Sequence, residues 1–202
     1  MNIHLLINII MRVIDTEKIE RVKKETKILI VERGYHGASI TEIAKRASVS
    51  DGYLYRHYKN KSALVSDIFE KQLAQLHDYI FELLQREKSV KAVLEGIIKF
   101  NFSLVKKEPY AIKFAHMLVY DHEFEYPKSR HDAIKKLTKD ILNLGKKTGE
   151  ISLNAREIDI QLTILTIPVK FIEYSDKKYY ESKISEKEEM GRLIGMCINS
   201  LK

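Results

Sequence analysis

An aromatic and basic run in the first third of the chain could bind a polyanion. The run is YLYRHYKNK, residues 53–61, and it carries phenol, guanidinium, imidazole and ammonium groups close together. These groups are hydrogen-bond donors of the kind that phosphate oxygens accept. A surface patch of aromatic side chains with solvated lysines is the plainer interpretation. The charge and the elements around the run have to decide between the two.

The net charge of +7 is concentrated in the same part of the chain. Residues 12–61 hold 12 Lys and Arg against 7 Asp and Glu, whereas the rest of the chain holds 23 against 21. A basic surplus confined to one small segment is expected of a polyanion-binding module. Lysine is also the ordinary solubilising residue, so the charge supports this interpretation without proving it.

The composition predicts an all-α protein with a core of its own. The 202 residues include only three prolines and eight glycines, and Leu, Ile, Lys and Glu dominate. A chain of this length needs no metal or disulfide to stabilise its core. Cys197 is the single cysteine, which excludes an internal disulfide and a cysteine-cluster metal site. We expect a buried thiol and a reducing, cytoplasmic location.

The first ten residues, MNIHLLINII, are apolar but too few to span a bilayer, which takes about 20 residues. They also lack the basic start and small-residue cleavage site of a secretory signal. We therefore expect no membrane partner. A polar helix start follows Met11, and our hypothesis is that Met11 is the natural start and that the apolar leader before it, residues 1–10, is mis-assigned.

Two short helical patterns with a tight break surround the start of the run. A helix is predicted from residue 16 to 33, ended by Gly34 in a left-handed cap. Ser39 and Glu42 form the capping box SITE, which begins a second helix that ends near residue 46 or 47. Ser50 can cap a third short helix through about residue 58. Two short helices around the break ASVS match a helix-turn-helix unit.

The rest of the chain is predicted to be helical as well. A long fourth helix begins at residue 61 or 62 and carries an apolar stripe to about residue 86. Later helical patterns end at prolines or glycines, and Pro168 is expected to kink the pattern that covers residues 155–175. These patterns cover residues 89–106, 109–122, 128–147, 155–175 and 185–201.

The segment GYHGASITEIAKRASVSDGYLYRHYKNKSAL resembles the TetR-type transcriptional regulators. The matching features are G-Y after the first helix, T-E-I-A in the second, V-S-x-G-x-L-Y-x-H-Y in the third and K-N-K-S-A-L at the fourth. The resemblance covers about residues 28–64. It implies an all-α homodimer with a helix-turn-helix domain, residues 12–61, and a ligand-binding and dimerisation domain, residues 62–202.

The same resemblance implies roles for the donors of the run. Tyr55 and His57 are similar to a tyrosine and a histidine with which the family contacts phosphate, and Thr41 resembles a further phosphate contact. Lys61, at a helix N-terminus, could bind a phosphate together with the free amides there. These contacts would position the protein on double-stranded DNA without specifying its sequence.

Packing of the third helix predicts which residues face the bases. If Val49, Leu54 and Tyr58 pack inward, the outward side chains are Ser50, Gly52, Tyr53, Arg56 and His57. Tyr53 is the best candidate for a base contact, because the family reaches the major groove from this position and its ring could cover a thymine methyl. Contact of Tyr53 with a phosphate instead, and a merely tolerated Gly52, are the plainer alternatives.

Asp51 departs from the family pattern, in which a non-acidic residue is common. An acid beside phosphates weakens DNA binding, and the helix dipole returns only about 0.3–1 kcal/mol. The carboxylate could accept a hydrogen bond from a cytosine amino group or orient Arg56. It could equally indicate weak DNA binding.

The C-terminal part holds candidates for an effector pocket and for a dimer interface. The aromatic middle of the chain suggests a small apolar or aromatic effector, with core packing as the alternative. The pocket candidates are Phe100, Phe114, Met117, Tyr120, Phe171 and Tyr174. Residues 157–174 are apolar on several faces, and two glycines four residues apart in the last helix leave a flat patch. The dimer candidates are Ile164, Pro168, Phe171, Gly191, Ile194 and Gly195.

Other classes of function find little support. No nucleophile elbow, phosphate loop or paired-acid signature is present, so an enzyme is not expected. The segment HMLVYDHEFEYPKSRH is rich in His, Asp and Glu, but no two histidines stand four apart on one helical face, so we expect no metal and no cofactor. The favoured function is a ligand-released repressor that acts on a palindromic operator. The alternative is a helical module for ligands or proteins that has lost DNA binding.

Overall fold

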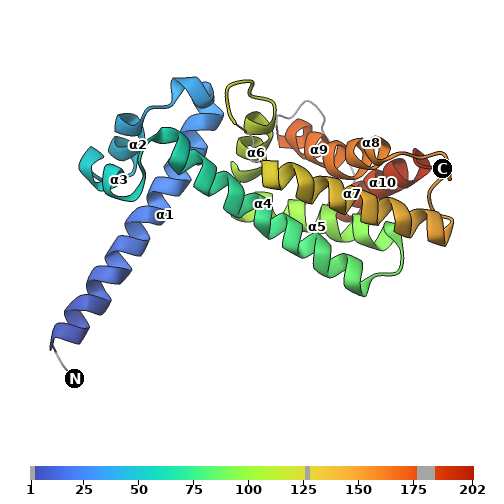
Figure 1. Cartoon of the computed structure of the whole chain (residues 1–202), viewed down its shortest axis with the longest axis horizontal. Coiled ribbons are helices and arrows are strands. Elements are labelled where there is room, and N and C mark those ends of the chain that lie inside the picture. Colours follow the sequence, from blue (N-terminus) through green and yellow to red (C-terminus); the bar gives the residue numbers. More distant parts are fainter. Residues whose placement is uncertain (1–2, 126–127, 177–184) are drawn as a thin grey trace. The chain divides into compact units, whose positions relative to one another are not determined.

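The computed structural model describes residues 3–125, 128–176 and 185–202, with side chains from 15–125, 131–174 and 185–202. The described residues are helical and hold no strand, so the all-α prediction is confirmed. The helices (Figure 1) are α1 Ile3–Gly37, α2 Ile40–Arg46, α3 Asp51–His57, α4 Lys61–Arg86, α5 Val90–Lys107, α6 Ala111–Val119, α7 Lys128–Thr148, α8 Glu157–Ile160, α9 Ile167–Asp176 and α10 Glu186–Asn199.

The helices form two compact units. The first contains residues 1–71 and 113–124, and the second contains residues 72–112 and 125–202. Helices α4 and α6 each contribute to both units, so the chain passes between them within these two helices and again after Phe124. Among the described residues, no helix is both long and apolar enough to cross a membrane.

Local signals set the helix ends of the first unit. The Ser39 hydroxyl accepts from the Glu42 amide at 3.2 Å, and the Ser50 hydroxyl accepts from the Tyr53 amide at 3.1 Å, so both predicted caps are confirmed. Glu42 does not complete a capping box. Its carboxylate instead lies 3.3 Å from the Arg33 guanidinium.

Helix α1 differs from its predicted bounds. It begins at Ile3 rather than near residue 16, and it is interrupted at Gly34, whose φ of +76° favours glycine. The predicted positive φ is confirmed, but ψ is 169°, so the conformation is extended rather than left-handed helical. One more turn follows before the chain enters α2.

A buried core holds α1, α2, α3 and α4 together within the first unit. Its fully buried members include Val22, Leu29, Ile43, Leu54 and Leu64. The Arg21 guanidinium also donates to the Ala47 carbonyl at 3.2 Å, which ties α1 to the end of α2. The helix-turn-helix is therefore a rigid platform on which the side chains of α3 have defined positions.

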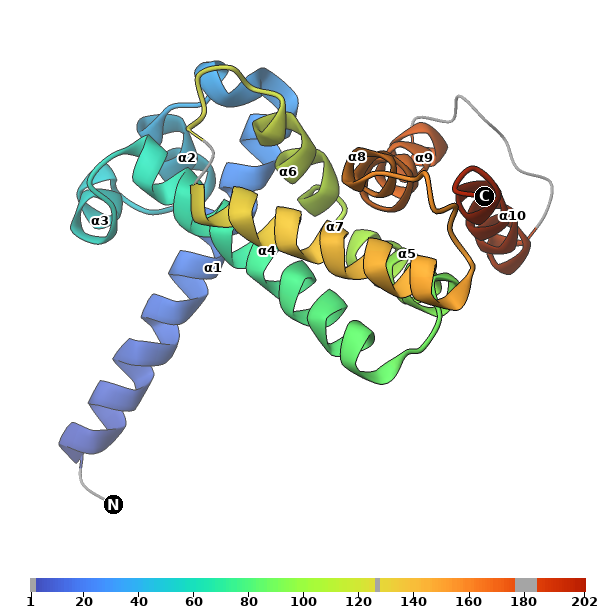
Figure 2. The same ribbon diagram turned by 45° about the vertical axis from the view of Figure 1, so that its right-hand side comes forward.

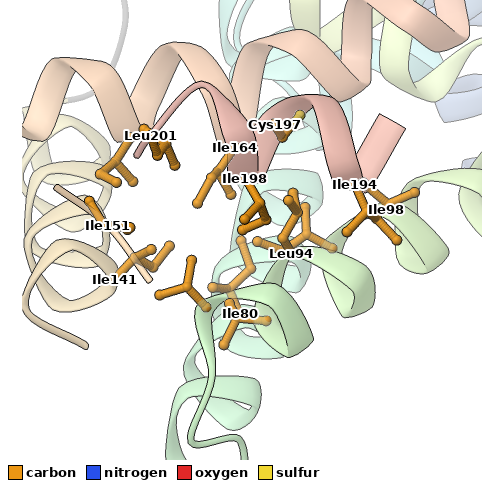
Figure 3. Packing of buried hydrophobic residues seen from close by; sticks show 14 of the residues in the cluster. Ile80, Leu94, Ile98, Ile141, Ile151, Ile164, Ile194, Cys197, Ile198 and Leu201 are labelled. Carbon is orange, nitrogen blue, oxygen red and sulfur yellow. The ribbon is translucent and has the colours of Figure 1, made fainter. Parts of the chain in front are cut away.

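The second unit is built around α5, which packs against α7, α9 and α10 (Figure 2). Leu94 and Ile98 of α5 lie in the same buried cluster as Ile141 and Ile194 (Figure 3). Cys197 of α10 belongs to this cluster, and burial raises the pKa of its thiol to about 11. The prediction of a buried thiol is confirmed.

The N-terminus of α5 is capped from a distant part of the chain. The Glu150 carboxylate accepts from the Val90 amide at 2.8 Å, from the Lys91 amide at 3.1 Å and from the Ser89 hydroxyl at 2.9 Å. An acid at a helix N-terminus satisfies free amides and matches the helix dipole. Glu150 therefore fixes the α7–α8 connection to the start of α5.

A widened turn joins α8 to α9. Residues Gln161–Thr166 form a π-helical turn, in which the Ile167 amide bonds to the Leu162 carbonyl five residues earlier. An α-helix turns about 100° per residue, so positions four apart drift about 40° at each step. The wider turn reduces this drift and keeps Ile160, Ile164, Pro168 and Ile172 buried. It lies directly before Pro168, where a kink was predicted.

Candidate nucleic-acid interface

The exposed face of α3 lies opposite Leu54, which is completely buried. Gly52 and Arg56 stand two positions before and after Leu54, which places them on the opposite side of the helix, and both are exposed. Tyr55 is 58% exposed. A Cβ on Gly52 would meet only the Ser50 hydroxyl, at 3.9 Å, so nothing within the chain requires a glycine there.

Tyr53 does not face outward, and this prediction is wrong. Its side chain is only 5% exposed, and its hydroxyl donates to the Asp15 carbonyl at 3.2 Å. Burial raises its pKa to about 12. The reason is that α1 extends past the flank of α3 and covers the side on which Tyr53 lies. The Arg56 guanidinium carbon and the Lys18 ammonium lie 5.7 and 5.8 Å from the ring centre, so the ring supports cations instead.

Lys61 is bound to the protein rather than presented as a free cation. Its ammonium donates to the Tyr35 carbonyl at 2.6 Å and to the Ala38 carbonyl at 3.0 Å, and it lies 4.3 Å from the centre of the Tyr35 ring. Burial lowers its pKa. Two of the three N–H donors of the Lys61 ammonium therefore join α4 to the α1–α2 connection. Only the third N–H is left for the predicted phosphate contact.

Thr41 and Asp51 bind each other. The Thr41 hydroxyl, in the first turn of α2, donates to the Asp51 carboxylate, in the first turn of α3, at 2.6 Å. This contact was not predicted, because sequence spacing does not show which side chains of two helices meet. It gives Asp51 a partner that is neither a base nor Arg56.

The other predicted DNA residues are accessible. His57 is exposed, with its Nε2 atom 3.8 Å from the Asp15 carboxylate and its ring centre 4.7 Å from that of Tyr53. Ser50 is exposed too, and its hydroxyl uses an acceptor site for the cap while its O–H can still donate. Tyr55, Arg56, His57 and Ser50 thus lie on the accessible part of α3.

Two exposed cations were not among the individually assigned DNA contacts. Lys45 lies four residues after Thr41 on α2, and Lys59 follows the end of α3. The four-residue spacing could have identified Lys45, because side chains four apart share a helix face. Arg46 has a different role, since its guanidinium lies 2.7 Å from the Glu32 carboxylate and joins α2 to α1.

The family model described as bacterial regulatory proteins, tetR family, matches residues 24–68, the part that forms this platform. This segment matches the TetR family. The fatty acid metabolism regulator protein of Bacillus subtilis (strain 168) is 26% identical over 126 residues, which are 61% of this chain and 65% of that protein. The chain therefore matches slightly less than two thirds of the length of this relative.

Solved structures share the fold over nearly the whole chain. A TetR family transcription regulator from Marinobacter aquaeolei VT8 has a TM-score of 0.76 at 17% identity and covers 94% of this chain and 98% of its own. AibR, solved in complex with isovaleryl coenzyme A and operator DNA, has a TM-score of 0.65 at 16% identity and covers 89% and 97%. The C-terminal helices thus share the fold of these two proteins.

The connection after α6 is anchored in the first unit. The Phe124 ring is buried and makes edge contacts with Tyr35 at 5.6 Å and Phe69 at 5.3 Å between ring centres. Asp121 accepts from the Phe124 amide at 3.0 Å and lies 3.6 Å from the His36 imidazole. This connection is therefore attached to α1 and α4 just before the chain enters the second unit.

The six pocket candidates are divided between the two units. Phe114 is fully buried on α6 in the first unit, where Met117 is partly buried and Tyr120 is exposed. In the second unit the Phe100 ring stacks on Tyr79 at 4.9 Å between ring centres. Phe171 lies near Phe102, and Tyr174 is exposed. Their role in binding an effector stays a prediction.

The predicted dimer residues need correction. Ile164 and Ile194 belong to the buried core of the second unit, and Pro168 is buried too, so these three already pack within their own chain. Gly191 and Gly195 do face open space, because a Cβ on either would meet nothing within 4 Å. Exposed apolar residues from α8 to α10 that sequence reasoning missed include Ile158, Leu162 and Met196. Once the buried positions of these helices are known, the spacing of the three residues from them identifies them as exposed.

Proposed function

We propose that this TetR-family protein is a sequence-specific regulator of transcription that binds double-stranded DNA, most simply as a repressor. The observation that carries the proposal is the outward face of α3, where Gly52, Tyr55 and Arg56 are exposed above a buried helix-turn-helix core. In such units the second helix enters the major groove. We retain residues 12–61 as the DNA-binding domain and residues 62–202 as the sensing and dimerisation domain, and we place the protein in the cytoplasm with its DNA.

Contacts to the DNA backbone would come from the edges of this face. Tyr55 and His57 are exposed donors on α3, and Lys45 and Lys59 add cations on either side. Such contacts release counterions. The logarithm of the binding constant should therefore fall linearly with the logarithm of the salt concentration, with a slope of about −0.9 for each phosphate contacted. Arg56, resting on the Tyr53 ring, is a better candidate for the base edges than Tyr53 itself.

The protein is proposed to act as a homodimer on a palindromic operator. The candidate contact surface is the exposed side of α8 to α10, where Leu162 is 51% and Met196 is 52% exposed and the glycines at 191 and 195 allow close approach of a helix. Exposed apolar residues on one unit are typical of a subunit interface. A two-fold dimer requires two half-sites related by the same symmetry.

The effector is proposed to be a small molecule with an apolar part, and acyl coenzyme A thioesters are the class to test first. The support comes from two similar proteins, a fatty acid metabolism regulator and AibR, which was solved in complex with isovaleryl coenzyme A and operator DNA. An effector that binds one conformation better shifts the population toward it. Release from DNA is the expected direction.

Selection of bound sequences from random duplex DNA tests the proposal. The wild-type protein should enrich an inverted repeat, and the Tyr55→Phe, His57→Ala double variant should lose it while keeping its helical circular dichroism. No enrichment at low salt would instead favour the alternative, a helical ligand-binding or protein-binding module that has lost DNA binding. Sedimentation of the free protein gives the oligomeric state independently.

A further inference from the structure

The Thr41–Asp51 pair stands on the accessible side of the first unit, and neither residue is the N-cap of α2 or α3. Both helices are already capped by Ser39 and Ser50, and the buried side chains of Ile43 and Leu54 pack them into the first unit. The hydroxyl donates to the carboxylate at 2.6 Å, which holds Asp51 in one position at the N-terminal end of α3. N-terminal residues of a recognition helix are those that contact base edges.

An acid at this position is costly unless it has a specific partner. Phosphates repel it wherever the protein meets DNA, and the exposed cations Lys45, Arg56 and Lys59 are all expected to draw the backbone close. Thr41 neutralises none of its charge, because a hydroxyl is an uncharged donor. A carboxylate with this placement therefore penalises every DNA sequence that does not offer it a hydrogen-bond donor.

The chemistry of the major groove limits what that donor can be. Guanine and thymine present only acceptors there, apart from the thymine methyl group. Adenine presents an amino group, but its N7 acceptor lies beside that group and repels a carboxylate. Cytosine presents an amino donor with no neighbouring acceptor of its own, and Asp and Glu are known to accept from it.

We propose that Asp51, held in place by Thr41, reads a cytosine in each half-site of the operator. This inference rests on the proposed function, since it requires α3 to enter the major groove. Asp51 touches the base, and Thr41 is a positioning residue whose hydroxyl is occupied by the carboxylate. The predicted phosphate contact of Thr41 is replaced by this role.

The test is selection from random duplex DNA with the full-length wild type and four single variants. Asp51→Asn keeps an acceptor for Thr41 but adds a donor, and an amide pairs with the N6 and N7 atoms of adenine. The selected base should therefore change from cytosine to adenine at one symmetric pair of positions. Asp51→Ala should lose the preference there, by about fivefold or more, while its affinity for random DNA stays equal or increases.

Two further variants separate positioning from charge. Thr41→Val removes the donor with little change in shape and should weaken the cytosine preference without shifting it to another base. Glu70→Gln removes one acid from α4, outside the helix-turn-helix, and should leave every position of the selected operator unchanged.

The outcomes distinguish the inference from the proposed function. If the wild type selects an operator and Asp51→Asn selects the same bases at every position, the inference is refuted and the regulator stands. If the wild type selects no sequence, both are refuted. Thermal unfolding of each variant checks that a lost preference does not come from a lost fold.

Discussion

Replacement of Tyr53 should affect stability, whereas replacement of its neighbour Tyr55 should affect DNA binding. Tyr53 is 5% exposed and Tyr55 is 58% exposed, although they are two positions apart on one short helix. Truncation of a buried aromatic side chain costs about 3–5 kcal/mol, so Tyr53→Ala should lower the free energy of unfolding by that amount. Tyr55→Ala should change it by no more than about 0.5 kcal/mol.

A conservative change isolates the hydroxyl of Tyr53. Tyr53→Phe keeps the buried ring but removes the donor to the Asp15 carbonyl, which should cost about 0.5–1.5 kcal/mol. Because burial raises the pKa of Tyr53 to about 12 from the usual 10.0, its protonated form stabilises the fold fully below pH 10. That contribution is lost as the pH rises through the folded pKa, and it should be absent in Tyr53→Phe.

The assay is urea unfolding followed by far-ultraviolet circular dichroism, paired with DNA binding by fluorescence anisotropy at one fixed salt concentration. Tyr53→Phe should retain DNA affinity once it is folded, whereas Tyr55→Phe should be as stable as wild type and bind more weakly. The reasoning would be refuted if Tyr53→Ala unfolded at the wild-type urea concentration and lost DNA binding, because Tyr53 would then be a surface reader.

Three other changes test separate features. Glu150→Gln should destabilise the second unit by about 0.5–2 kcal/mol. Burial raises the Glu150 pKa, but hydrogen bonds from Thr148 and the α5 amides outweigh it, so the pKa is lowered. The stability advantage of the wild type should therefore be present above pH 4.5 and be lost as the pH falls, as measured by acid titration of stability. Gly52→Ala should stabilise α3 by up to about 1 kcal/mol in thermal unfolding and yet weaken DNA binding. A DNA affinity equal to that of the wild type would show that the α3 backbone does not approach DNA closely. Phe124→Ala should lower the free energy of unfolding of the first unit by about 3–5 kcal/mol. Hydrogen exchange of the α1 amides measures this, and protection equal to that of the wild type would contradict it.

The predictions that succeeded concern local chemistry. Ser39 and Ser50 cap their helices as expected, because a cap depends only on a side chain and an amide three residues later. Gly34 interrupts α1 for a similarly local reason. The helix-turn-helix itself was predictable, since its motif residues are contiguous in sequence and match a known pattern.

The predictions that failed depend on long-range packing. The period of α3 identified Leu54 as buried but could not show that α1 covers the flank that holds Tyr53. The sequence also could not show that the Lys61 ammonium donates to the Tyr35 and Ala38 carbonyls, which lie more than 20 residues away, and its phosphate contact stays a prediction. Ile164 was assigned to the dimer surface because an apolar segment does not reveal which of its faces the chain itself buries.

The widened turn between α8 and α9 bears on how the chain can change in length. A turn closed by a bond over five residues contains one residue more than an ordinary helical turn. Deletion of one residue from Gln161–Thr166 could convert it to an ordinary turn, with the residues before and after still facing the same core. Deletion anywhere else in this helix would rotate all that follows by about 100°. The turn is thus the position at which this helix can shorten by one residue and keep its register.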